Sequence, residues 1–99
     1  MNQISQFNNE DINDLRKQLD LLDTELIEVL ARRMALIPMV AEYKKKNNVA
    51  RYQPEREKEV IKDRRQLAEK LTLNPDLVED MIKRIIEDAH RIESEIMGE

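Results

Sequence analysis

Residues 12–43 read INDLRKQLDLLDTELIEVLARRMALIPMVAEY, and this stretch decides the fold. Apolar side chains recur in it at alternating steps of three and four residues, which is the spacing of a seam along one face of an α-helix. A helix of this length exceeds the usual globular helix and favours packing against a helix of another chain. The seam positions are Ile12, Leu15, Leu19, Leu22, Leu26, Val29, Arg33, Leu36, Val40 and Tyr43.

Arg33 is the charged member of this seam. An isolated guanidinium on an apolar stripe loses hydration worth on the order of several kcal/mol unless an anion meets it. That anion is either an acidic side chain in a dimer seam, where polar residues often set register, or a bound ligand. The residues by themselves leave both interpretations open.

The composition indicates an all-α protein. The 99 residues include one glycine, three prolines and 3% aromatic residues, against 38% charged residues, so the side chains that favour strands and turns are scarce. A chain this short makes one domain and buries only roughly two-thirds of its unfolded surface. Its helices therefore gain by packing against a second copy.

Charge and residue usage narrow the function classes. The formal net charge of −4 argues against nucleic acid as a partner, because that function needs a broad basic face. With no cysteine and one histidine we expect no metal site, although the many carboxylates leave a site of oxygen ligands formally open. The missing cysteines and the lack of an apolar signal region favour a cytoplasmic location, and no apolar run is long enough for a membrane span.

We expect a flexible N-terminal arm over residues 1–8 and a single helical domain over residues 9–99. The first helix should begin near Asn9 to Asp11 and continue to about Lys46. Pro38 lies in its interior, where proline costs about 3 kcal/mol, so the sequence predicts a kink or a break there.

Two further helices complete the predicted three-helix protomer. A loop over residues 47–53 precedes Pro54, which takes the favoured first position of a second helix ending near Leu71. Asn74 is the predicted cap of the third helix, and Pro75 opens it.

Glu93 falls on the apolar stripe of the third helix and is the second charge in an apolar position. The stripe consists of Val78, Met81, Ile82, Ile85, Ile86, Ala89, Ile92 and Ile96.

Helix geometry relates three of the cations. On a straight helix Lys44 lies about 20° around and about 16 Å along from Arg33, so both can hold one small dianion. Arg16 lies about 25 Å from Arg33 and about 100° off in direction. It can therefore reach the same ligand only from a second, antiparallel chain.

Short motifs follow one another along the chain: Leu15-Arg16, Leu22-Asp23, Ala31-Arg32-Arg33, VAEYK at residues 40–44, YQPERE at residues 52–57 and IIED at residues 85–88. In their order and spacing they resemble the helical AroQ-type chorismate mutases, from about Glu10 to Met97. The YQPERE run, with NPDLVED at residues 74–80, is especially similar to mutase domains fused to prephenate dehydrogenase.

The resemblance implies an isomerase that rearranges chorismate to prephenate in phenylalanine and tyrosine biosynthesis, with no metal and no cofactor. It also implies an intertwined homodimer whose first helices pair antiparallel, so that Arg16 enters the site of the other protomer. By the same resemblance Arg33, Lys44 and Arg56 hold the two carboxylates and the ether oxygen of chorismate. Glu57 then accepts a hydrogen bond from the ring hydroxyl.

Three site positions depart from the common family pattern. Gln53 stands where many members have aspartate, Ala89 where many have a carboxylate-binding serine, and Glu93 where many have a glutamine facing the ether oxygen. Catalysis is expected from Lys44, Glu93 and Arg33. The residues expected to bind substrate are Arg16, Arg33, Lys44, Gln53, Arg56, Glu57 and Ala89. Because a glutamate donates a hydrogen bond only when protonated, activity should decline as pH rises.

Each of these residues also has a structural interpretation. Arg16 can pair with Asp20, and Lys44 can be an ordinary solvated helix end. Arg56 and Glu57 can be first-turn residues, Glu93 can be a buried acid paired with a lysine or arginine, and His90 can be a flank residue.

Two other functions fit the same resemblance. One is an isochorismate-pyruvate lyase on the same fold. The other is a non-catalytic binding or regulatory module that has lost turnover through Ala89 and Glu93.

Overall fold

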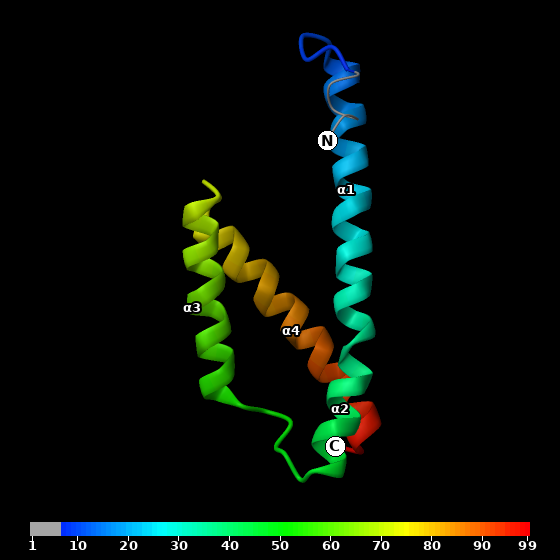
Figure 1. The fold of residues 1–99 in the computed structure, drawn as a ribbon, viewed down its shortest axis with the longest axis vertical. Coiled ribbons are helices and arrows are strands. Elements are labelled where there is room, and N and C mark those ends of the chain that lie inside the picture. Colours follow the sequence, from blue (N-terminus) through cyan, green and yellow to red (C-terminus); the bar gives the residue numbers. More distant parts are fainter. Residues whose placement is uncertain (1–6) are drawn as a thin grey trace. The chain divides into compact units, whose positions relative to one another are not determined.

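The computed structural model describes residues 7–99, in which helices are joined by short turns and loops and no strand occurs (Figure 1). The helices are α1 (Ile12–Ala35), α2 (Ile37–Lys46), α3 (Pro54–Lys70) and α4 (Pro75–Met97). This confirms the all-α prediction, with α1 and α2 together occupying the predicted first helix. Within residues 7–99, no helix is both long and apolar enough to cross a membrane.

The described chain forms two compact units, one ending at Ala35 and the other running from Leu36 to Glu99. The interruption between α1 and α2 is a single residue, Leu36, which keeps helical dihedral angles of φ −80° and ψ −20°. Its cause is Pro38, which has no N–H to continue the helical ladder. The ladder resumes at once, since the Leu36 carbonyl accepts from the N–H of Val40 at 3.0 Å.

The first unit consists of α1 and the turn before it. Asp11 caps the helix, because its Oδ1 accepts from the N–H of Asn13 at 2.8 Å. The N–H of Asn8 donates to Asp14 Oδ2 at 3.1 Å, which ties down the end of the predicted arm. Residues 1–6 of that arm lie outside the described residues, so its flexibility stays a prediction.

The apolar seam of α1 is exposed in the single chain. Leu15 is 37% exposed, and Leu19, Leu26 and Val29 are each more than half exposed. Gln18 is the buried residue of this helix, and its Nε2 donates to Asn9 Oδ1 at 2.6 Å.

In the second unit α4 contacts both α2 and α3, and Figure 1 shows it leading from the end of α3 back to α2. Short or branched aliphatic side chains make the buried core of this unit: Ala41, Val60, Ala68, Ile82 and Ala89. This packing brings predicted site residues of α2, α3 and α4 close to one another.

The connections in the second unit follow their local sequence. Asn48 adopts a left-handed φ of 54°, and the N–H of Val49 returns to the carbonyl of Lys44 at 2.9 Å. Asn74 accepts from the N–H of Asp76 at 2.9 Å and so caps α4. The predicted loop over residues 47–53 and both predicted proline starts are confirmed.

Candidate active site

Lys44 and Glu93 form a nearly buried ion pair between α2 and α4. Lys44 Nζ lies 2.7 Å from Glu93 Oε1, and their side chains are only 15% and 7% exposed. Lys44 Nζ also donates to the carbonyl of Arg51 at 2.8 Å. An ammonium group has three N–H donors, so one remains for a ligand. This is the pairing that the interpretation of Glu93 as a buried structural acid predicts. It also places the Lys44 ammonium beside Glu93, which the family resemblance assigns to catalysis.

Glu57 and His90 form a second contact, between α3 and α4. His90 Nε2 lies 2.7 Å from Glu57 Oε2, and His90 Nδ1 lies 2.8 Å from Arg51 Nη1. The ring of Tyr52 meets the imidazole edge-on, with centroids 6.1 Å apart and planes at 66°. Three side chains from the loop and α3 therefore hold the imidazole.

Arg51 joins the two contacts into one network. Its carbonyl accepts from Lys44, its Nη1 contacts His90, and its Nε lies 3.2 Å from Glu99 Oε1 near the end of the chain. The left-handed residue Asn48 reverses the chain after α2, and Arg51 then contacts Lys44 of α2 and His90 of α4. The order of groups is Glu93, Lys44, Arg51, His90 and Glu57.

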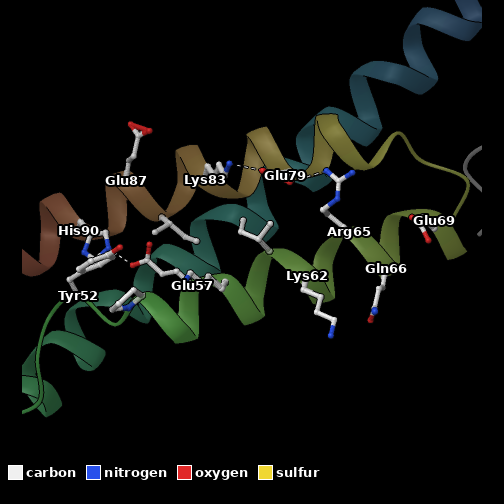
Figure 2. Close-up of a pocket in the computed structure, with 14 residues that line it drawn as sticks. Tyr52, Glu57, Lys62, Arg65, Gln66, Glu69, Glu79, Lys83, Glu87 and His90 are labelled. Atoms are coloured by element: carbon white, nitrogen blue, oxygen red, sulfur yellow. Dashed lines mark hydrogen bonds and ion pairs between the residues drawn. The ribbon is translucent and has the colours of Figure 1, made fainter.

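A cavity of about 900 Å³ lies between α3 and α4, with Tyr52, Glu57 and His90 at one end (Figure 2). Ile61 and Ile86 supply apolar lining.

The other end of the cavity carries an ion-pair cluster. Arg65 Nη1 contacts Glu79 Oε1 at 2.8 Å and Asp76 Oδ1 at 3.0 Å, and Lys83 pairs with Glu79. Hydrogen bonds from Lys83 and then Arg65 hold the pKa of Glu79 below its usual range. This end is charged and partly solvated, whereas the Glu57 end combines an acceptor with aromatic and apolar surfaces.

The other predicted residues of the second unit are less engaged. Ala89 is buried on α4, one turn before Glu93. Gln53 precedes α3 and its side chain makes no capping hydrogen bond. Arg56 pairs with Glu59 one turn along α3, with its side chain 57% exposed. Ala89 and Glu93 thus lie on α4, and Lys44 and Glu57 lie on the helices that contact it. Arg56 instead forms a surface pair.

Arg16 and Arg33 lie on α1, in the first unit. Arg33 is half-buried, and its Nη1 is buried with no hydrogen-bond partner among the described residues. Arg16 is exposed, and within residues 7–99 the ion pair of this region joins Lys17 to Asp14, not Arg16 to Asp20. The interruption at Leu36 falls between Arg33 and Lys44, and their convergence on one ligand stays a prediction.

Arg51 and His90 were not predicted as site residues. His90 was interpreted as a flank residue, yet it bridges α3 and the loop. A signal was present, because His90 directly follows Ala89 and lies three residues before Glu93, on the side of α4 that carries the site.

A family model described as chorismate mutase type II matches residues 15–94, a range that includes every predicted site residue. The T-protein of Enterobacter agglomerans is 35% identical over 85 residues, and the T-protein of Haemophilus influenzae is 36% identical over 86 residues. These alignments cover 86% and 87% of this chain but 23% of each relative. A bifunctional chorismate mutase/prephenate dehydratase of Aquifex aeolicus is 36% identical over 52 residues, 52% of this chain and 14% of that protein.

Proposed function

The chain belongs to the chorismate mutase type II family, and we propose that it is a chorismate mutase, an isomerase converting chorismate to prephenate for phenylalanine and tyrosine biosynthesis. The observation that carries the proposal is Lys44, held by Glu93 and Arg51 with one donor left over. The reaction is an intramolecular rearrangement, so it requires no nucleophile, metal or cofactor. The protein must therefore accelerate the reaction by positioning the substrate and by holding fixed charges beside it.

Lys44 is the group proposed to act on the breaking bond. Negative charge grows on the ether oxygen of chorismate as its carbon–oxygen bond lengthens, and a fixed ammonium meets that charge. Such a contact is stronger in the transition state than in bound substrate, so it raises the rate and not only the affinity. Glu93, when protonated, donates to the same oxygen.

Arg33 and Arg56 are proposed to bind the carboxylates of chorismate. The buried, unpartnered Nη1 of Arg33 supports this role, since a bound carboxylate would satisfy it. Arg56 must exchange Glu59 for the substrate, and an exposed pair of this kind is worth little, so the exchange costs little.

Glu57 accepts from the ring hydroxyl, Gln53 contacts the substrate at the start of α3, and Ala89 lines the site without a polar contact.

The active form is proposed to be a homodimer in which Arg16 of the partner subunit completes each site. The exposed seam of α1 supports this, because a continuous apolar stripe of this kind favours a helical partner. We further propose a cytoplasmic enzyme, which the absence of cysteine favours. Sedimentation of the purified protein should give twice the mass of the 11.8 kDa chain.

Incubation of the purified protein with chorismate tests the function, with the product identified as the substrate disappears. We expect prephenate. Release of pyruvate from isochorismate, without prephenate from chorismate, would indicate the lyase instead. Tight binding of a transition-state analogue without turnover of either substrate would indicate a non-catalytic module.

A further inference from the structure

His90 is the single histidine of the chain, and both of its ring nitrogens are engaged. It lies on α4, and Figure 2 shows Glu57 of α3 and Tyr52 of the loop beside it. Arg51 of the loop contacts its Nδ1. Its side chain is 21% exposed, so solvent reaches only part of the ring.

The chemistry of the partners determines which nitrogen carries the proton. A guanidinium has only N–H donors, so at 2.8 Å Arg51 Nη1 donates and His90 Nδ1 accepts. A neutral imidazole then carries its proton on Nε2 and donates it to Glu57 Oε2. The contacts therefore favour the Nε2–H tautomer over the Nδ1–H tautomer.

This contact fixes the carboxylate of Glu57. The Glu57 side chain is 31% exposed and has three rotatable bonds, so without a partner it would occupy several rotamers. The N–H of His90 takes Oε2 and leaves Oε1 to accept from a ligand. Tyr52, packed edge-on against the imidazole, limits the rotation of the ring itself.

We infer that His90, oriented by Arg51, is a positioning residue that holds the Glu57 carboxylate ready for the ring hydroxyl of the substrate. The inference rests on the proposed function, because it assigns the hydroxyl contact to Glu57. His90 acts through Glu57 and does not touch the reacting atoms. Its effect is therefore on substrate recognition more than on the rearrangement.

Kinetics of His90→Leu and His90→Gln test the role. Leucine removes both polar contacts, and we expect the KM for chorismate to rise about tenfold, as for the loss of one well-oriented hydrogen bond, with kcat changed much less. Glutamine has a donor and an acceptor on one amide and should recover most of the loss. Arg91→Leu, at the adjacent position of α4, is the matched control and should leave KM within about twofold.

A double-variant comparison separates positioning from general damage to α4. If His90 acts through Glu57, adding His90→Leu to Glu57→Ala, which removes the acceptor of the His90 N–H, should change KM no further. Independent, multiplicative effects of the two substitutions, or failure of glutamine to improve on leucine, would overturn the inference.

Nitrogen-15 NMR of the imidazole tests the geometry without turnover, and a single histidine makes the assignment unambiguous. We expect the Nε2–H form in unliganded protein and a loss of that preference in Arg51→Leu. A predominant Nδ1–H form in a protein that makes prephenate would overturn the inference alone. An Nε2–H form in a protein that never converts chorismate would overturn the proposed function while leaving the tautomer assignment in place.

Discussion

Two interpretations were given for Glu93, a buried acid paired with a cation and a hydrogen-bond donor to the ether oxygen, and its position fits both. Its residue exposure is 5%, and Lys44 lies 2.7 Å away, so in the resting protein it serves as the carboxylate that compensates a buried ammonium. The same contact keeps Glu93 beside the cation proposed to meet the ether oxygen. A carboxylate there repels the growing negative charge, whereas a protonated acid donates to it.

If Glu93 donates to the ether oxygen as the neutral acid, activity should fall as pH rises, because a carboxylate has no proton to donate. We expect kcat for chorismate to decline by up to about tenfold per pH unit on the basic side of the profile, as for one essential proton. Glu93→Gln donates at every pH and should flatten the profile between about pH 5 and 8. Glu95→Gln, two residues along α4 and 68% exposed at its side chain, is the control and should retain the wild-type profile. An unchanged decline in Glu93→Gln would remove this role.

At the scale of single elements, the end of α3 is strained. The N–H of Leu73 returns to the carbonyl of Ala68 at 2.8 Å and the N–H of Thr72 to Glu69 at 3.2 Å, which is a Schellman motif. The motif places Thr72 at φ 59°, where a β-branched residue is disfavoured and glycine is usual.

Thr72→Gly should therefore stabilise the protein. A residue with a Cβ in the left-handed conformation costs about 1–2 kcal/mol, and Thr72→Gly removes that cost. Part of the gain is offset because glycine has greater conformational freedom in the unfolded chain. We expect the free energy of unfolding to rise by about 0.5–1 kcal/mol in urea at fixed protein concentration. Thr72→Ala keeps the Cβ, so a gain as large as that of glycine would contradict the strain argument.

The ion pairs of Glu79, with Lys83 on α4 and with Arg65 on α3, predict how stability depends on pH. Lys83 and Arg65 lower the pKa of Glu79 below its ordinary value of 4.5, so the ionised carboxylate stabilises the fold above that pH. This contribution is lost as pH falls through the lowered pKa.

Glu79→Gln should be less stable than wild type near neutral pH, and the difference should shrink toward zero as the medium is acidified below about pH 4. Urea unfolding at a series of pH values measures it. Glu69→Gln, on α3 and without an ion pair among residues 7–99, should show a much weaker dependence. A Glu79→Gln difference that stayed constant or grew on acidification would contradict this linkage.

At the scale of the whole molecule, the features that could be predicted from the sequence are those that depend on residues close together along the chain. Pro54 and Asn74-Pro75 start helices through backbone and capping rules that need only neighbouring residues, and Pro38 interrupts one for the same reason. Glu93 could be singled out as a charge in an apolar stripe. The contacts of His90 could not, because its partners lie 33 and 39 residues away and only the packing of α4 brings them together.

The proposed dimer makes the sharpest prediction, because each site takes Arg33 from one protomer and Arg16 from the other. Arg16→Ala and Arg33→Ala homodimers should both fold, remain dimeric and be nearly inactive. When equal amounts exchange subunits at random, about half of the dimers are mixed, and each mixed dimer contains one intact site and one doubly deficient site. About a quarter of all sites, and hence about a quarter of wild-type activity, should return. If each site used its own Arg16, mixed dimers would hold no intact site, so verified exchange without recovery would contradict the shared site.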